Sequence, residues 1–160
     1  MTDTKQKDNK ILVTPEGYKA LKVEYDNLVN IQRPANVDMI IRAREMGDLS
    51  ENGMYSAAKE KQSFIEGRIL EIEEILKKVE IVEKVSGSKQ KVDVGSKVTV
   101  NITQKDIVFH IVGGEEVDST QNKISHESPL GAALMGKSVG DQVEVDAPAG
   151  KVSYKIIKII

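Results

Sequence analysis

The spacing of apolar residues divides the chain into a helical first half and a strand-like second half. After a short apolar run at 11–13, apolar residues recur at steps of three and four, which is typical of an amphipathic helix. The first such series is Tyr18, Leu21, Tyr25 and Leu28. Thr14-Pro15-Glu16, just before it, has the residues favoured at a helix start. Pro34 lacks a backbone donor, so we expect it to kink this helix or restart it. A less regular series follows it, made of Val37, Ile40, Ile41 and Met46.

A second helical series is longer and more regular. It consists of Tyr55, Ala58, Gln62, Ile65, Ile69, Ile72, Leu76 and Val79. Seven-residue repeats of this kind indicate a coiled coil. A helix from Glu51 to Glu80 would be about 45 Å long at 1.5 Å per residue. Because each apolar stripe is narrow, we predict that the two helices pack against each other as an antiparallel hairpin that projects.

The second half has the alternation and the turn residues of a small β-sheet domain. Strands are predicted at 97–103, 106–112, 142–147 and 151–160, and a short helix between Ser128-Pro129 and Gly136. The predicted class is therefore α+β with two domains. The segments are a disordered tail at 1–10, a coiled-coil hairpin at 11–84, a linker at 85–91 and an antiparallel sheet domain at 92–160.

Composition excludes several classes of function. A net charge of −2 does not predict a nucleic-acid-binding surface over the whole molecule. The chain has no cysteine, which excludes disulfides and thiolate metal sites, and His110 and His126 are too isolated to predict a zinc site. No apolar run is long enough to span a membrane, and the polar N-terminus is not a signal peptide. We expect a cytoplasmic monomer without a cofactor of its own.

The connection between the two helices, 47–52, contains the candidate chemistry. Gly47 allows the chain to reverse, and Asp48 and Glu51 stand three residues apart. This spacing is most commonly a capping box at a helix start. A second interpretation is a weak Mg²⁺ site, shared with a partner whose phosphates supply further oxygens. A glycosidase-type pair would need a cleft, which a hairpin tip lacks.

Basic residues flank this connection and acidic residues lie further from it. The basic residues are Arg42, Arg44, Lys59 and Lys61, with Arg33 and Arg68 further back. One interpretation is an ordinary solvated face of a coiled coil. The alternative is a local contact with phosphates, favoured by the segregation of charge along the predicted hairpin.

Several motifs together resemble the bacterial transcript cleavage factors of the GreA/GreB family. In the first half these are Arg44–Asn52, Tyr55, 57–60 and 64–69. In the second half they are 122–125, 128–131, 134–137 and 140–141. The resemblance covers nearly all of 11–160, and the run at the hairpin tip is highly specific. The low net charge is more similar to the GreA branch than to the basic GreB branch.

The resemblance implies an accessory factor of bacterial RNA polymerase that is not an enzyme by itself. In this family the coiled coil enters the secondary channel of a backtracked polymerase. The tip acids, here Asp48 and Glu51, help to hold a Mg²⁺ shared with the polymerase, and the 3′ end of the nascent RNA is cleaved. The implied contacts with RNA or polymerase are Arg44, Lys59, Arg42, Lys61 and Asn52. An FKBP-like C-terminal domain docks on the channel rim, here through Ser128, Pro129, Leu130, Gly136 and Lys137.

Some positions depart from the family pattern, and three other functions stay open. Gly53-Met54 stands where relatives commonly have alanine and an acid, and Ala132 where a basic residue is frequent. An inhibitory paralogue would occupy the same channel without stimulating cleavage. A peptidyl-prolyl isomerase would need aromatic residues, and 92–160 contains only Phe109 and Tyr154. A coiled-coil adaptor would not depend on the tip acids.

Overall fold

The chain forms two compact units, which a computed structural model describes for residues 10–48, 52–82 and 90–160. One unit combines the chain up to Tyr18 with Val79–Ile160, and the other is Lys19–Lys78. The α+β class predicted from the sequence is confirmed. The sequence placed the start of the hairpin domain at residue 11. In the structure, the described residues up to Tyr18 belong to the same compact unit as the C-terminal half. The predicted tail and linker fall mostly on 1–9 and 83–89, outside the described residues. No helix in the described ranges is long and apolar enough to cross a membrane.

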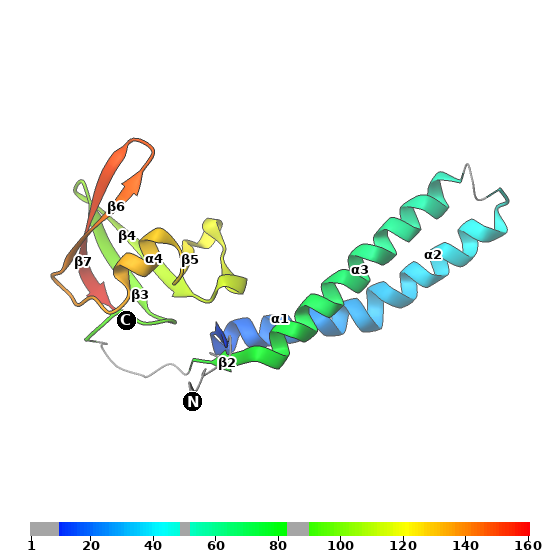
Figure 1. Ribbon diagram of the computed structural model, residues 1–160, viewed down its shortest axis with the longest axis horizontal. Coiled ribbons are helices and arrows are strands. Elements are labelled where there is room, and N and C mark those ends of the chain that lie inside the picture. The colour runs from blue at the N-terminus through cyan, green and yellow to red at the C-terminus, as the bar shows by residue number, and fades with distance from the viewer. Residues whose placement is uncertain (1–9, 49–51, 83–89) are drawn as a thin grey trace, which may run out of the picture. The chain divides into compact units, whose positions relative to one another are not determined.

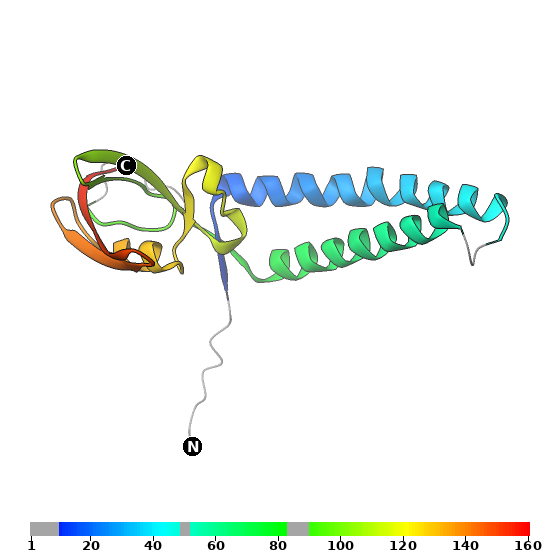
Figure 2. The ribbon, with the colours of Figure 1, turned by 90° about the horizontal axis from the view of Figure 1, so that it is seen from above.

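The first limb of the hairpin is a helix with an interruption (Figures 1 and 2). It consists of α1 (Pro15–Asn27), a π-helical turn η1 (Leu28–Gln32) and α2 (Arg33–Glu45). Thr14 caps α1, since its Oγ1 accepts a hydrogen bond from the Gly17 N–H at 3.1 Å. Pro34 lies in the first turn of α2, so the predicted interruption at this proline is confirmed.

The second limb is the single helix α3 (Gly53–Lys78), which runs antiparallel to the first (Figure 2). Its 26 residues correspond to about 39 Å, and it is shorter than predicted because the chain enters a strand at Val79. The buried residues of α3 are Ala58, Ile65, Ile69, Ile72 and Ile75. The predicted heptad is thus largely confirmed, with Ile75 buried in place of Leu76.

The buried stripe of α2 differs from the predicted one. Its members are Asn36, Ile40 and Ala43. Val37, Ile41 and Met46, which the sequence assigned to the stripe, are 43%, 48% and 69% exposed. The sequence predicted an interruption at Pro34 but not the π turn η1, which lies directly before α2.

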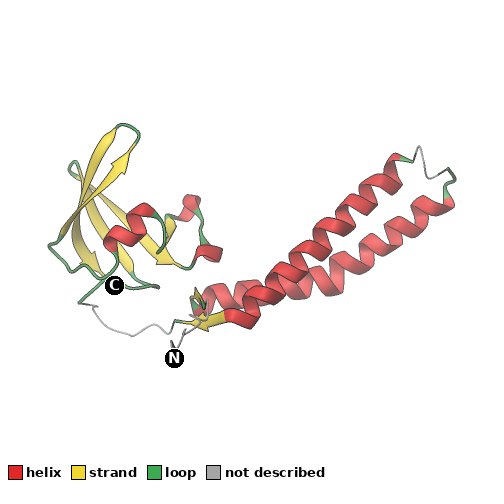
Figure 3. Cartoon of the chain, in the orientation of Figure 1, coloured by secondary structure: helices red, strands yellow, loops and turns green. Residues whose placement is uncertain are grey.

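The C-terminal unit contains a sheet covered by a short helix (Figure 3). Among its described residues the strand order is β5-β4-β3-β7-β6. The bounds are β3 Lys97–Ile102, β4 Lys105–Val112, β5 Lys123–Ser125, β6 Gln142–Ala147 and β7 Gly150–Ile159, with two 3₁₀ turns, η2 (Gly114–Glu116) and η3 (Ser119–Gln121), before β5. The helix is α4 (Pro129–Leu134). The prediction of an antiparallel sheet needs one correction, because β5, too short to show alternation, pairs in parallel with β4. The buried core consists of Val92, Val98, Val100, Ile111, Leu134, Val143, Ile156 and Ile159.

The Glu116 side chain hydrogen-bonds to Thr14, the residue just before α1. Strand β1 (Ile11–Val13) pairs in parallel with β2 (Val79–Ile81). The Glu116 carboxylate accepts a hydrogen bond from the Thr14 N–H at 2.8 Å, and its other oxygen accepts one from the Thr14 hydroxyl. Gly17 has to lack a side chain, because a Cβ there would lie 2.1 Å from Glu116 Cδ. No spacing pattern indicates this contact, because the two residues lie about a hundred positions apart.

Candidate functional site at the hairpin tip

The turn after α2 presents Asp48 to solvent. Helix α2 ends at Glu45, and Gly47 follows with φ +115°, a conformation that residues with a side chain rarely adopt. A Cβ at Gly47 would meet nothing within 4 Å, so the turn requires glycine for its backbone conformation alone. Asp48 comes next and is exposed. Glu51, the second predicted acid, lies outside the described residues.

Asn52, not Asp48, caps helix α3. Its Oδ1 accepts a hydrogen bond from the Tyr55 N–H at 3.1 Å, and its Nδ2 donates to the Ala43 carbonyl oxygen at 2.7 Å. A capping box built on Asp48 would need the helix to begin at residue 49, whereas α3 begins at Gly53. Asp48 is therefore not the N-cap of α3. Asn52 joins the two limbs at the tip, and its predicted contact with polymerase stays a prediction.

The four predicted basic residues are all exposed on the last turns of α2 and the first turns of α3. The Arg44 guanidinium carbon lies 6.0 Å from the centroid of the Tyr55 ring, which is within range of a cation–π contact. Lys59 Nζ donates to Gln62 Oε1 at 2.7 Å, and no hydrogen bond or ion pair with another described residue holds Arg42 or Lys61. The surface around Asp48 can thus offer cations to an anionic partner, although their predicted contacts are untested.

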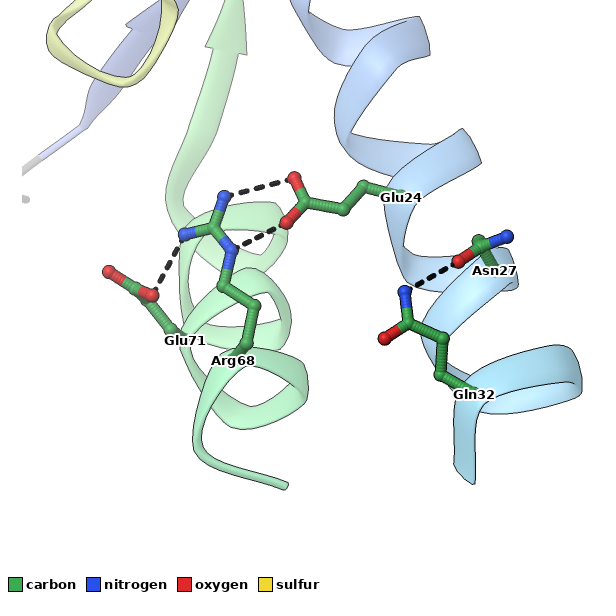
Figure 4. A network of polar contacts seen from close by, with 5 residues as sticks. All are labelled: Glu24, Asn27, Gln32, Arg68 and Glu71. Atoms are coloured by element: carbon green, nitrogen blue, oxygen red, sulfur yellow. Dashed lines mark hydrogen bonds and ion pairs between the residues drawn. The ribbon is translucent and has the colours of Figure 1, made fainter. Parts of the chain in front are cut away.

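Arg33 and Arg68 do not belong to this basic group, because carboxylates of the arm already engage them. Arg68 holds Glu24 in a two-bond pair at 2.7 and 3.0 Å and also contacts Glu71 at 2.8 Å (Figure 4). Arg33 holds Glu66 in the same way, at 2.8 and 2.6 Å. Hydrogen bonds from these arginines lower the pKa of Glu24 and of Glu66. These pairs link the two limbs of the arm behind the tip.

The tip can supply carboxylate oxygens to a metal ion but not a complete site. Within the described ranges, no three residues among His, Asp and Glu lie close enough to hold a metal together. Asp48 and Glu51 offer two carboxylates, the hard oxygen ligands that Mg²⁺ prefers. An octahedral ion would need its other ligands from water or from a partner. The chemistry of the donors therefore fits a shared Mg²⁺.

Three of the five predicted rim residues, Ser128, Leu130 and Gly136, cap, pack or end helix α4 in the C-terminal unit. Ser128 Oγ accepts a hydrogen bond from the Gly131 N–H at 3.1 Å and caps α4, while Leu130 packs against the core. Gly136 has φ +73° and ends the helix, with its N–H donating to the Val92 carbonyl at 2.9 Å. The side chains of Pro129 and Lys137 are exposed. The docking role of all five residues stays a prediction.

The C-terminal aromatic residues give no support to the isomerase alternative. Phe109 and Tyr154 are partly buried and both pack against the hydrophobic core of the unit. Side chains used in this way do not line a site for a proline-containing peptide.

Comparisons with known proteins give the same family for both halves of the chain. Residues 11–81 match the model described as "Transcription elongation factor, N-terminal", and residues 87–160 match "Transcription elongation factor, GreA/GreB, C-term". The transcription elongation factor GreA of Thermodesulfovibrio yellowstonii is 48% identical over 94% of this chain and 97% of its own length. GreA of Clostridium acetobutylicum is 44% identical, over 95% and 98%. The crystal structure of GreA factor homolog 1 (Gfh1) of Thermus thermophilus is 28% identical, covers 95% of this chain and 99% of that one, and has a TM-score of 0.44. The chain belongs to the GreA/GreB family of transcription elongation factors.

Proposed function

We propose that this protein is a bacterial transcription elongation factor that binds RNA polymerase and stimulates cleavage of backtracked RNA. The arm would enter the secondary channel, and the polymerase would perform the cleavage at its own active site. One observation carries this proposal: the family-specific run at the tip contains an exposed acid, Asp48, while Asn52 caps the helix after it. Membership of the GreA/GreB family supports the assignment.

The tip acids would act as ligands that complete a metal site in the polymerase. Two carboxylates alone bind Mg²⁺ weakly, so we expect a metal only in the complex, where Asp48 and Glu51 add to the polymerase's ligands. A metal held there would lower the pKa of a bound water and make it a nucleophile toward the RNA phosphodiester. Asn52 supports this role indirectly, because its bonds to Tyr55 and Ala43 fix the end of the connection that carries both acids.

The exposed basic residues would hold the RNA while the acids act. Arg44 and Lys59 are exposed and lie on different limbs close to the tip in sequence, so they could contact phosphates of the backtracked 3′ segment from two sides. Arg42 and Lys61 would contribute less specific attraction. Contacts of this kind weaken with added salt, because binding a phosphate releases counterions.

The C-terminal unit would supply binding to the channel rim. Its exposed Pro129 and Lys137 lie at either end of α4, a short helix capped by Ser128 and ended by Gly136. A rigid, capped helix is a suitable docking element because little conformational freedom is lost on binding.

The test is to add the full chain to a backtracked elongation complex with labelled RNA. The proposal predicts shortening of the RNA from its 3′ end and renewed extension when nucleotides are supplied. The control is the variant Pro15→Ala, which changes a proline remote from the tip in sequence and should behave as wild type. Inhibition of extension without any cleavage would contradict the proposal and favour the inhibitory function. No effect on the complex would favour the adaptor function.

A further inference from the structure

The π turn η1 is a one-residue irregularity in the arm, and Pro34 explains it. The Arg33 N–H donates to the carbonyl of Leu28, five residues earlier, where an α-helix would use the residue four earlier. Pro34 has no N–H for the Asn30 carbonyl, and its ring would crowd that carbonyl in a regular helix. The wider turn relieves this crowding. Gln32 Nε2 and Asn27 Oδ1, also five residues apart, bond across it at 2.7 Å (Figure 4).

The π turn decides which face of α2 meets α3. An unbroken helix that continued the heptad of Leu21 and Leu28 would bury positions 35, 39, 42 and 46. The structure instead buries Asn36, Ile40 and Ala43, which are 2%, 7% and 0% exposed, and leaves Met39 42% exposed. Each buried position is one residue later than the unbroken pattern requires. One residue corresponds to a rotation of about 100° of α2 about its axis.

The resulting face of α2 carries one polar side chain, Asn36, whereas the unbroken pattern would bury Arg42. It places Asn36 between the helices, where Nδ2 donates to the Ala58 carbonyl at 3.1 Å. Oδ1 of Asn36 is buried, and no described residue hydrogen-bonds to it. Burial of an unsatisfied acceptor is unfavourable, so the side chain at position 36 does not itself favour this orientation.

We propose that Pro34 is a positioning residue, which sets the rotation of α2 and thereby the direction in which the arm presents its acidic tip. The rotation matters at the tip because α2 leads directly into Gly47 and Asp48. It also aligns Ala43 with Asn52 and Arg44 with Tyr55. The functional consequence rests on the function proposed above, but the rotation itself can be measured without polymerase.

The test compares wild type with Pro34→Ala and with a Pro34→Ala variant from which Asn30 is also deleted. Without the proline the helix can close the π turn, and α2 should rotate by one residue. Deleting one residue from the turn should restore the original face on a regular helix, because Arg33 would then follow Leu28 by four positions. Pro15→Ala, at the first position of α1, is the matched proline control and should leave the rotation unchanged.

Met39 reports the rotation, because it is exposed now and would enter the interface in the rotated helix. Its rate of oxidation by peroxide can be measured by mass spectrometry relative to Met54 on α3, which is 53% exposed. We expect Pro34→Ala to slow oxidation of Met39 several-fold relative to Met54. Cleavage in the backtracked complex should fall at least about tenfold, as expected for misplaced catalytic ligands. The deletion variant should recover both values.

Three results would overturn the proposal. The first is a Met39 oxidation rate in Pro34→Ala equal to that of wild type. The second is a slowed rate that the deletion of Asn30 does not restore. The third is a loss of helical circular dichroism in Pro34→Ala, because removing a proline from a helix whose rotation it only selects should not unfold the arm. If wild-type protein fails to stimulate cleavage, the proposed function fails, and the oxidation rates still decide the role of Pro34.

Discussion

Replacing Asn36 with leucine should stabilise the arm, although it removes an interhelical hydrogen bond. In wild type the buried Oδ1 of Asn36 has no partner among the described residues, which destabilises the arm by about 1–3 kcal/mol; the substitution removes this penalty. It loses the bond to the Ala58 carbonyl, which is worth about 1 kcal/mol. Burial of a leucine side chain stabilises the arm by about 1.5–3 kcal/mol, and overpacking destabilises it by about 1–3 kcal/mol. A small hollow beside Asn36, lined by Arg33, Val37 and Gln62 among others, lessens that strain. The net gain should be about 1 kcal/mol.

Thermal unfolding followed by circular dichroism at 222 nm measures this gain, because most helical residues lie in the arm. For a chain of this size about 1 kcal/mol corresponds to about 2–4 °C. Two matched variants at the same position give the expected order. Asn36→Ala leaves a gap and should melt below wild type, and Asn36→Asp buries a charge and should melt lowest. If Asn36→Leu melted below wild type, the lost hydrogen bond and the overpacking would outweigh the gain, and the reasoning would be wrong.

Three further predictions concern the rest of the fold. Arg68 and Arg33 lower the pKa values of Glu24 and Glu66, so these pairs stabilise the fold fully above pH about 4.3. This stabilisation should be lost as the pH falls through the lowered pKa values. Replacing both arginines with methionine should therefore flatten the loss of helicity in an acid titration. Gln104 has φ +68° in the two-residue turn between β3 and β4, a conformation that favours glycine. Gln104→Gly should therefore raise the free energy of unfolding in a urea titration by about 0.5–1 kcal/mol. A lower free energy of unfolding would contradict the prediction. Gly17→Ala should destabilise wild type by about 1 kcal/mol or more but should be nearly neutral in a Glu116→Ala background, as a double-mutant cycle would show.

The regular parts of the fold could be predicted because they follow local rules. The start of α1 at Thr14-Pro15, the heptad of α3 and the caps of α4 all follow from residue types at fixed spacing, and the structure agrees with them. The strands of the C-terminal sheet also lie close to their predicted ranges, apart from the very short β5. Local pattern is sufficient where each residue's environment depends on its near neighbours.

The features that were missed depend on contacts or turns that local pattern does not encode. The apolar spacing after Pro34 placed Val37 in the interface, whereas the structure, with a π turn before α2, buries Asn36 there. The pair of Thr14 and Glu116 joins residues about a hundred positions apart, so no spacing rule indicates it. At the tip, one interpretation of the sequence placed a helix cap at Asp48, whereas the structure gives the cap of α3 to Asn52.

The most direct test of the account is the dependence of cleavage on the tip acids and on Mg²⁺. The double variant Asp48→Asn/Glu51→Gln keeps the size of both side chains, and since Asn52 caps α3 it should melt within about 1 kcal/mol of wild type. If the acids share a metal with the polymerase, cleavage of backtracked RNA should fall by orders of magnitude at low Mg²⁺ and recover in part at high Mg²⁺. Competition for polymerase binding should not change. Near-normal cleavage by the double variant at limiting Mg²⁺ would contradict the central claim.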